Sequence, residues 1–276
     1  MSNEGQIVLV LSSGRCGTQW LANTLHQVYG EAVRVTHEPL GAAYAPKRYF
    51  RSYLGNVPGP PPIVSDHVAA VAAGDGPYVE TGWPLYSAIP HFVEVCGGRV
   101  KIVHLTRHLV PMALSHMVHQ TYSGSPRKDQ YTEMATLDPW TENVFQKSER
   151  TSWEDMEPYE HCVFWCTEVH AYGFELPGYL ADTPLLRVRF EDLFDPSRNA
   201  LEEVVDFIGL SWDQGLERHL TIRKDAWHHQ NLLDFDWRSI EMHPLAMEVL
   251  ERMGYSLEDV DPSLLEERYV GPPTHS

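Results

Sequence analysis

A glycine-rich segment near the start of the chain has the residue types needed to bind an anion. The apolar run IVLVL is followed by SSGRCGT and then by the amphipathic sequence QWLANTL. A strand that turns sharply into a helix directs unpaired backbone N–H groups and the positive end of the helix dipole to one point. Gly14 and Gly17 allow a close backbone approach, and Arg15 adds a delocalised positive charge. Hydroxyl groups are offered by Ser12, Ser13 and Thr18. The segment therefore predicts a phosphate site.

The spacing of this segment narrows the choice of phosphate ligand. A nucleoside-triphosphatase loop has the pattern G-x-x-x-x-G-K-[ST], in which the Lys contacts the terminal phosphates and the hydroxyl binds magnesium. Here the glycines are three residues apart, and Thr18 and Gln19 follow the second one. The magnesium-binding half of the pattern is missing, which argues against an ATP-dependent enzyme.

The segment G-R-C-G-T-Q-W-L resembles the 5′-phosphosulfate loop of the sulfotransferases that use 3′-phosphoadenosine 5′-phosphosulfate (PAPS), whose usual form is P-K-S-G-T-T-W. Arg15, Cys16 and Phe190 depart from the common Lys, Ser and Tyr of this family. The resemblance implies that Arg15 acts on the leaving group and that Trp20 stacks on adenine. The nucleotide-binding residues that it implies in this loop are Gly14, Arg15, Cys16, Gly17, Thr18, Gln19 and Trp20.

A second pair of residues carries the same resemblance. Arg107 follows the β-rich run VKIVHLT, and Ser115 lies in the helical pattern after it. Their spacing matches the family's signature R-x-x-x-x-x-x-x-S, which binds the 3′-phosphate of PAPS. An Arg at a strand end and a Ser on the next helix can both reach one phosphate.

Two further segments resemble elements of the same family and extend the likeness over most of the chain. R-F-E-D-L at 189–193 is similar to the R-Y-E-D-L that follows the last core strand of sulfotransferases, and its acids suit a structural role at a helix start. M-E-V-L-E-R-M-G-Y at 247–255 is similar to the terminal helix and Gly-Tyr of bacterial and Golgi-type members.

The candidates for the general base are His37, Glu38, His67 and Glu80. Pro39 disfavours helical geometry at the residue before it, so we expect Glu38 to be presented from an extended strand end. The family's K-T-H motif has no His counterpart in V-E-T-G-W, whereas His37-Glu38-Pro39 resembles the Glu-Pro element of the bacterial and Golgi-type members. The resemblance therefore implies Glu38 as the base, with His37 next and Glu80 third.

The remaining pattern alternates strands with helices and predicts an α/β fold, a three-layer sandwich around a mainly parallel sheet. We expect β-strands at 7–11, 32–36, 77–83, 100–105 and 185–190. The first expected helix starts at Gln19 and ends near Gly30. The others span 63–73, 87–96, 108–122, 157–172, 195–208 and 244–253, and the one at 244–253 is expected to be the last helix of the chain. The segment 123–152 lacks a clear period and predicts a mobile excursion. No internal repeat is present, so we expect one domain over residues 1–276.

Composition limits the partners and the compartment. A net charge of −17 argues against a nucleic-acid binder, and cations such as Arg15, Arg107 and the Arg223-Lys224 pair are islands in an acidic surface. The four cysteines are Cys16, Cys96, Cys162 and Cys166, which lack the His partners of a zinc site and predict reduced thiols of a cytoplasmic protein. The start MSNEGQ is polar and no apolar run reaches about 18 residues, so we expect no signal peptide and no membrane anchor.

The resulting hypothesis is a bacterial-type sulfotransferase that transfers a sulfuryl group from PAPS to a hydroxyl or amine, leaves 3′-phosphoadenosine 5′-phosphate (PAP), and requires no metal. The acceptor, a small molecule or a carbohydrate, is not readable from the loops 42–60 and 123–152. Two alternatives remain open. One is a P-loop kinase-like enzyme that uses ATP, and the other is a non-catalytic nucleotide-binding protein of the same fold.

Overall fold

The computed structural model describes residues 5–41, 43–119, 121–122, 134–220 and 236–269. Arg223 and Lys224, which the sequence singled out, lie outside these described residues, as does part of the expected excursion at 123–133.

A five-stranded parallel sheet forms the centre of the molecule. Its strands are β1 (Ile7–Leu11), β2 (Arg34–His37), β3 (Tyr78–Thr81), β4 (Val100–Thr106) and β5 (Leu185–Arg189), in the spatial order β2-β3-β1-β4-β5. All four pairings are parallel. Every residue of β1 is buried, because this strand is covered on both faces and on both edges. The predicted α/β class with a parallel sheet is confirmed.

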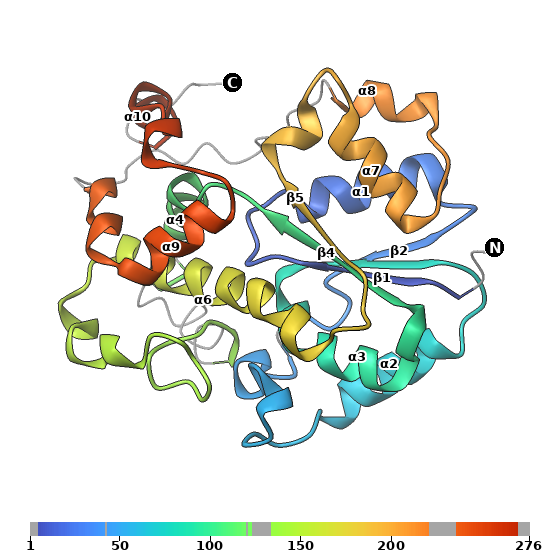
Figure 1. The fold of residues 1–276 in the computed structure, drawn as a ribbon, viewed down its shortest axis with the longest axis horizontal. Coiled ribbons are helices and arrows are strands. Elements are labelled where there is room, and N and C mark those ends of the chain that lie inside the picture. The colour runs from blue at the N-terminus through green and yellow to red at the C-terminus, as the bar shows by residue number, and fades with distance from the viewer. Residues whose placement is uncertain (1–4, 42, 120, 123–133, 221–235, 270–276) are drawn as a thin grey trace.

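Helices cover both faces of this sheet (Figure 1). On one side lie α1 (Thr18–Tyr29), α7 (Asn199–Ile208) and α8 (Glu217–Leu220). On the other side lie α2 (Pro62–Ala72), α3 (Ile89–Cys96), α4 (Leu109–Val118) and α6 (Pro158–Tyr179). Two helices near the end of the described chain, α9 (Pro244–Arg252) and α10 (Pro262–Tyr269), follow beyond α6. The result is the expected sandwich of helices, sheet and helices.

The register of the sheet brings the functional segments to one edge. Leu11 at the end of β1 pairs with His104 of β4, and Val10 pairs with Thr81 of β3. Because all strands run in the same direction, the segments after β1, β2, β3 and β4 leave the sheet at the same edge. In open α/β sheets this carboxyl edge is where ligands bind. The end of β4 thereby lies beside the glycine-rich loop that follows β1.

Several element boundaries differ from the prediction. β2 begins at Arg34 rather than at residue 32, and α6 continues seven residues past its expected end, to Tyr179. Asp195 does not cap α7: its carboxylate accepts a hydrogen bond of 2.7 Å from the Ser197 N–H in a separate turn, and α7 begins only at Asn199. The helix at 244–252 is not the last, since α10 follows it.

Residues 134–152, the described part of the segment predicted to be a mobile excursion, pack against the rest of the protein. At 134–152 the chain packs through buried side chains that include Leu137, Asn143 and Val144. The buried Glu168 on α6 anchors it by accepting hydrogen bonds from the N–H groups of Phe145 (2.9 Å) and Gln146 (2.8 Å). The sequence pattern misses this packing because short 3-10 turns have no long hydrophobic period.

Candidate active site

The loop between β1 and α1 has the backbone geometry of an anion cradle. Gly14, Arg15 and Gly17 have φ values of 87°, 58° and 78°, and Gly17 is the residue that precedes α1. Two of these left-handed positions are glycines because a Cβ is strained there, and Arg15 adopts the same region at a cost of about 1–2 kcal/mol. The Ser12 hydroxyl closes the turn by accepting a 2.9 Å hydrogen bond from the Gly14 N–H.

Three side chains of the loop face the protein interior rather than a ligand. Ser12, Ser13 and Cys16 are fully buried. The Cys16 thiol lies 3.0 Å from Met112 Sδ, and burial raises its pKa to about 11. The predicted contribution of the Ser12 and Ser13 hydroxyls to ligand binding is therefore wrong, and Cys16 can contribute only its backbone N–H. Thr18 is buried at the start of α1, and Gln19 is exposed.

The two arginines predicted from separate motifs meet at this loop. Arg15 Nε donates a 2.8 Å hydrogen bond to Ser115 Oγ, on α4. Arg107 Nη1 donates a 2.8 Å hydrogen bond to the Arg15 carbonyl oxygen. The Nε of Arg107 is buried and has no hydrogen-bond partner among the described residues. A buried cationic N–H without an acceptor is costly unless an anion completes it, so this cluster has the chemistry of an anion site.

The R-F-E-D-L segment packs directly against the loop. A Cβ on Gly17 would lie 2.1 Å from Phe190 Cε2, so only glycine fits beneath this ring. The Arg107 guanidinium lies 5.3 Å from the centroid of the same ring. Phe190 thus holds the loop and the arginine together by packing.

The acids of this segment, Glu191 and Asp192, lie in the first turn of the short 3-10 helix η7 (Glu191–Phe194), at the helix start that the sequence indicated. The Tyr255 hydroxyl donates a hydrogen bond to the Glu191 carboxylate, and Arg189 Nη1 donates one of 3.1 Å to the Gly254 carbonyl oxygen. These contacts tie the Gly-Tyr segment after α9 to the end of β5.

Trp20 belongs to an aromatic cluster beside the loop. Its ring is 4.5 Å from that of Phe194, which in turn lies 5.0 Å from Phe190, measured between centroids. The indole N–H of Trp20 is buried and has no partner among the described residues. Trp20 as a whole is partly exposed.

Glu38 follows β2 and lies beside the same loop. Its φ is 51°, so its backbone is left-handed and the expected extended geometry is wrong. The Glu38 N–H donates a 2.9 Å hydrogen bond to the Thr81 carbonyl oxygen, which extends the strand pairing and overrides the preference set by Pro39. Burial raises the pKa of the Glu38 carboxyl, while the Trp83 backbone N–H and the charge of Arg15 act in the opposite direction.

Gly82 leaves the space that the Glu38 side chain occupies. A Cβ at Gly82 would lie 2.3 Å from Glu38 Cγ, and the φ of 133° at Gly82 is itself reserved for glycine. Trp83, the next residue, lies against Gly14 of the loop, where an added Cβ would be 3.1 Å from Trp83 Cβ. The residues of the turn after β3 therefore contact both Glu38 and the anion loop.

His37 supports this arrangement from the end of β2. Its Nδ1 lies 2.8 Å from Thr81 Oγ1, and its Nε2 is 3.6 Å from Glu38 Oε1, which is too long for a hydrogen bond. Burial lowers the pKa of His37, which favours the neutral imidazole. His37 and Glu38 are both partly exposed, with 27% and 29% of their side-chain surface accessible.

The other two candidates for the base bond to each other instead. His67 Nε2, on α2, lies 2.7 Å from Glu80 Oε2, and the Tyr78 hydroxyl donates a 2.6 Å hydrogen bond to the same oxygen. Glu80 is only 2% exposed. This network stabilises the packing of α2 on the sheet and occupies the side chains of both residues.

The sequence did not predict two buried, hydrogen-bonded histidines, His104 and His170, that lie beneath the loop. His104 Nε2 lies 2.9 Å from His170 Nδ1, and His170 Nε2 lies 3.3 Å from Ser13 Oγ. Burial lowers the pKa of His170 to about 3, so the pair is neutral. Trp165 completes the support, because its indole N–H donates a 2.9 Å hydrogen bond to the Ser13 carbonyl oxygen. No motif spacing links these residues, since they come from β4, α6 and the loop.

His116, also unpredicted, lies behind the loop. Its Cε1 would be 3.4 Å from a Cβ at Gly14, and its Nε2 is buried with no hydrogen-bond partner among the described residues. Burial and the nearby Arg15 lower the pKa of His116 to about 3. Its position next to Ser115 in the sequence is the one signal that could have indicated it.

Neither a metal cluster nor a membrane span is found in the described part of the chain. No three His, Cys, Asp or Glu side chains there are grouped so that they could hold an ion. Within the same residues, no helix combines the length and apolar character needed to cross a bilayer. All four cysteines are buried and free, as predicted.

Comparison with known proteins links this geometry to solved structures. No protein-family model and no curated protein matches the sequence. The sulfotransferase domain of the Synechococcus PCC 7002 olefin synthase superposes with a TM-score of 0.51 and 18% identity, over 93% of this chain and 97% of that domain. A sulfotransferase from Alicyclobacillus acidocaldarius has a TM-score of 0.51 and 15% identity, over 94% of this chain and 98% of the other. On these likenesses, which extend over nearly the whole of each chain, the protein has the sulfotransferase fold.

Proposed function

We propose that the protein transfers a sulfuryl group from PAPS to an acceptor hydroxyl or amine and leaves PAP. The observation that carries this proposal is the cluster in which Arg15 bonds Ser115 and Arg107 bonds the Arg15 carbonyl oxygen. It combines the two motifs that the sequence associates with the two ends of the nucleotide. The sulfotransferase fold supports the same assignment.

The 5′-phosphosulfate would be held by the loop and by the start of α1. The backbone N–H groups after Gly14 and the helix dipole favour an anion there. The nucleotide's 3′-phosphate would be held by Arg107 and Ser115. The buried Nε of Arg107 has no partner within the part of the chain that the structure describes, which supports this, because a phosphate oxygen would supply the acceptor. Trp20 would contribute its exposed part to the adenine.

The reaction needs a base on one side of the sulfur and a cation on the other. The acceptor oxygen forms a new S–O bond, the bond from sulfur to the bridging oxygen of the nucleotide breaks, and the acceptor proton leaves to the base. Negative charge grows on the bridging oxygen, and Arg15 with the loop amides would stabilise it. Arg15 is the charged side chain of the loop itself, so it suits this role.

Glu38 is the base that the geometry supports. Its side chain packs against Gly82, which precedes Trp83 at the anion loop, whereas Glu80 is bonded to His67 and Tyr78. A raised pKa makes a carboxylate a better proton acceptor near neutral pH. His37, neutral and bonded to Thr81, would orient the end of β2 and is the second candidate.

Nucleotide titration tests the proposal directly. Calorimetry should give a much tighter Kd for PAP than for AMP or ATP, because those two lack the 3′-phosphate that Arg107 and Ser115 would contact. Charge-assisted hydrogen bonds of this kind are worth about 1.5–3 kcal/mol each, so the preference over AMP should exceed about tenfold. Equal affinity for PAP and AMP would overturn the site assignment, and magnesium-dependent ATP turnover would favour a kinase-like enzyme.

A further inference from the structure

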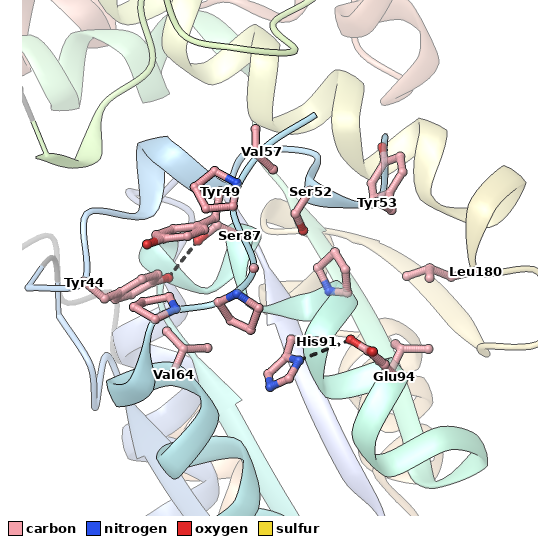
Figure 2. Close-up of a pocket in the computed structure, with 16 residues that line it drawn as sticks. Tyr44, Tyr49, Ser52, Tyr53, Val57, Val64, Ser87, His91, Glu94 and Leu180 are labelled. Carbon is pink, nitrogen blue, oxygen red and sulfur yellow. Dashed lines mark hydrogen bonds and ion pairs between the residues drawn. The ribbon is translucent and has the colours of Figure 1, made fainter. Parts of the chain in front are cut away.

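A cavity of about 360 Å³ lies between the segment 44–61, the start of α2, one face of α3 and the end of α6 (Figure 2). Ligand pockets for small molecules start at roughly 300 Å³, so this cavity can enclose most of a compact molecule. Aromatic and proline rings form much of its wall: Tyr44, Tyr49, Tyr53, Pro58, Pro60 and Pro61. The segment 44–61 is part of the region that the sequence indicated as a determinant of the acceptor.

Several polar groups of the wall already have partners within the protein. The Tyr44 hydroxyl donates to the Pro84 carbonyl oxygen and lies 2.9 Å from Ser87 Oγ. His91 Nδ1 lies 3.3 Å from Glu94 Oε2, and the two side chains point toward each other in Figure 2. A sugar carries a hydroxyl on nearly every carbon, and each one buried without a partner costs roughly 1–3 kcal/mol. The cavity therefore suits an apolar occupant better than a carbohydrate.

The elements that form the cavity wall also carry exposed apolar side chains. Each of four large apolar residues, all more than a third exposed, is next in the sequence to a residue that lines the cavity: Leu54, Ile63, Val95 and Tyr179. They belong to the segment 44–61, α2, α3 and α6. Apolar side chains gathered at one place on a soluble protein mark a binding site more often than isolated ones do.

One short helix connects the cavity wall to the anion loop. The 3-10 helix η3 (Trp83–Ser87) starts at Trp83, against Gly14, and ends at Ser87 in the cavity wall. Four steps of a 3-10 helix span roughly 8 Å. Tyr44 also lines a second, much smaller cavity, which Glu38 borders. The side chain of Tyr44 is thus shared by the walls of the large cavity and of the space beside Glu38.

We propose that this cavity holds the apolar, ring-bearing body of the sulfuryl acceptor, an alcohol or a phenol, whose hydroxyl passes Tyr44 to reach Glu38. The proposal rests on the proposed function, and it selects an apolar small molecule over a carbohydrate. Tyr44 is then the residue that sets the distance between the acceptor body and its reacting oxygen.

The test uses 2-naphthol as the probe and N-acetylglucosamine as the carbohydrate comparison. Calorimetric titration of the full chain saturated with PAP should show saturable binding of 2-naphthol and none of N-acetylglucosamine. Ser52→Phe places a ring in the cavity from its wall and should weaken 2-naphthol binding at least tenfold. Ser148→Phe adds the same ring at an exposed position of another 3-10 turn and should leave binding unchanged.

The outcomes separate this inference from the proposed function. If PAP binds and 2-naphthol does not, or if Ser52→Phe and Ser148→Phe bind it equally, the cavity assignment is wrong while the sulfotransferase proposal stands. If PAP does not bind in a parallel titration, the proposed function fails, and the acceptor role fails with it. A dimer in sedimentation that Ile63→Ser dissociates would assign the exposed apolar residues to a second copy of the chain and also overturn the inference.

Discussion

Arg15 Nε donates a 2.8 Å hydrogen bond to Ser115 Oγ, across 100 residues of sequence. This contact joins the loop after β1 to the helix after β4, so the two halves of the proposed nucleotide site are one hydrogen-bonded unit. Arg107 donates a hydrogen bond to the backbone carbonyl of the same arginine. The residues proposed for one end of the nucleotide are therefore bonded to those proposed for the other end. The first two predictions separate the contributions of this unit.

We expect Ser115→Ala to reduce the preference for PAP over AMP. Loss of one hydrogen bond to a charged phosphate should weaken PAP binding about 10- to 100-fold, whereas AMP has no 3′-phosphate to lose. Calorimetric Kd values for both nucleotides give the measurement. Ser197→Ala, at an exposed serine far from the loop in sequence, is the matched control. An equal loss for PAP and AMP would show that Ser115 acts only by orienting Arg15.

Arg15→Ala should lower turnover far more than nucleotide affinity. The charge of Arg15 is needed most when the bridging oxygen becomes negative, and removal of one such donor costs about 10²–10³ in rate. Arg15→Lys keeps the positive charge. Lysine and alanine are both strained at the left-handed φ of 58°, so the two variants share that cost. Comparison of kcat and PAP Kd in the two variants therefore isolates the charge. If only the Kd changes in Arg15→Ala, the catalytic cation lies elsewhere.

Glu38→Gln should reduce turnover by about two to four orders of magnitude, because the amide cannot accept the acceptor proton. Nucleotide affinity should stay nearly unchanged. The wild-type rate should fall as the pH falls through the Glu38 pKa, which burial raises above its ordinary value, since only the carboxylate is a base. This acidic limb should be absent from the residual rate of Glu38→Gln. Near-normal turnover in Glu38→Gln and a collapse in His37→Ala would transfer the role to His37.

Gly82→Ala tests the position of Glu38 without altering its carboxylate. The added Cβ would lie 2.3 Å from Glu38 Cγ and must displace that side chain. We expect turnover to fall at least tenfold while PAP affinity is retained. Gly76→Ala also places alanine at a positive φ, of 80°, but its Cβ meets nothing within 4 Å. Similar kinetics for the two variants would mean that backbone strain, and not Glu38, explains the loss.

Glu168 should make the stability of the protein depend on pH. Burial raises the pKa of this carboxyl to about 7, although the N–H groups of residues 145 and 146 act in the opposite direction. The folded state then binds more protons than the unfolded state between about pH 4.5 and 7, so the free energy of unfolding falls as the pH rises through that range. A shift of this size corresponds to about 3 kcal/mol.

Urea unfolding of the wild type and of Glu168→Gln between pH 5 and pH 8 measures this contribution. The wild type should lose stability toward pH 8, and Glu168→Gln should lose about 3 kcal/mol less over the same range. Glu149→Gln, on the partly exposed turn that precedes α6, is the control and should follow the wild type. Identical pH profiles for the wild type and Glu168→Gln would contradict the assignment.

The positions of the nucleotide motifs were predictable from the sequence because each depends on local chemistry. Gly14 and Gly17 occur where the chain must turn left-handed between a strand and a helix, and Arg107 with Ser115 follows the next buried strand. Strands and helices that alternate predict a parallel sheet, and a parallel sheet brings the ends of its strands to one edge. The fold class and the neighbourhood of β1 and β4 followed from those two rules alone.

Only the tertiary structure decided which side chains meet. Long-range pairing set the backbone of Glu38, whose hydrogen bond to Thr81 overrides the local preference set by Pro39. Packing between distant elements turned Cys16 inward, bonded Glu80 to His67, and assembled His104, His170 and Ser13 beneath the loop. A sequence pattern carries only near-neighbour periodicity, whereas these contacts join residues on separate elements, so their partners emerge only when the core closes.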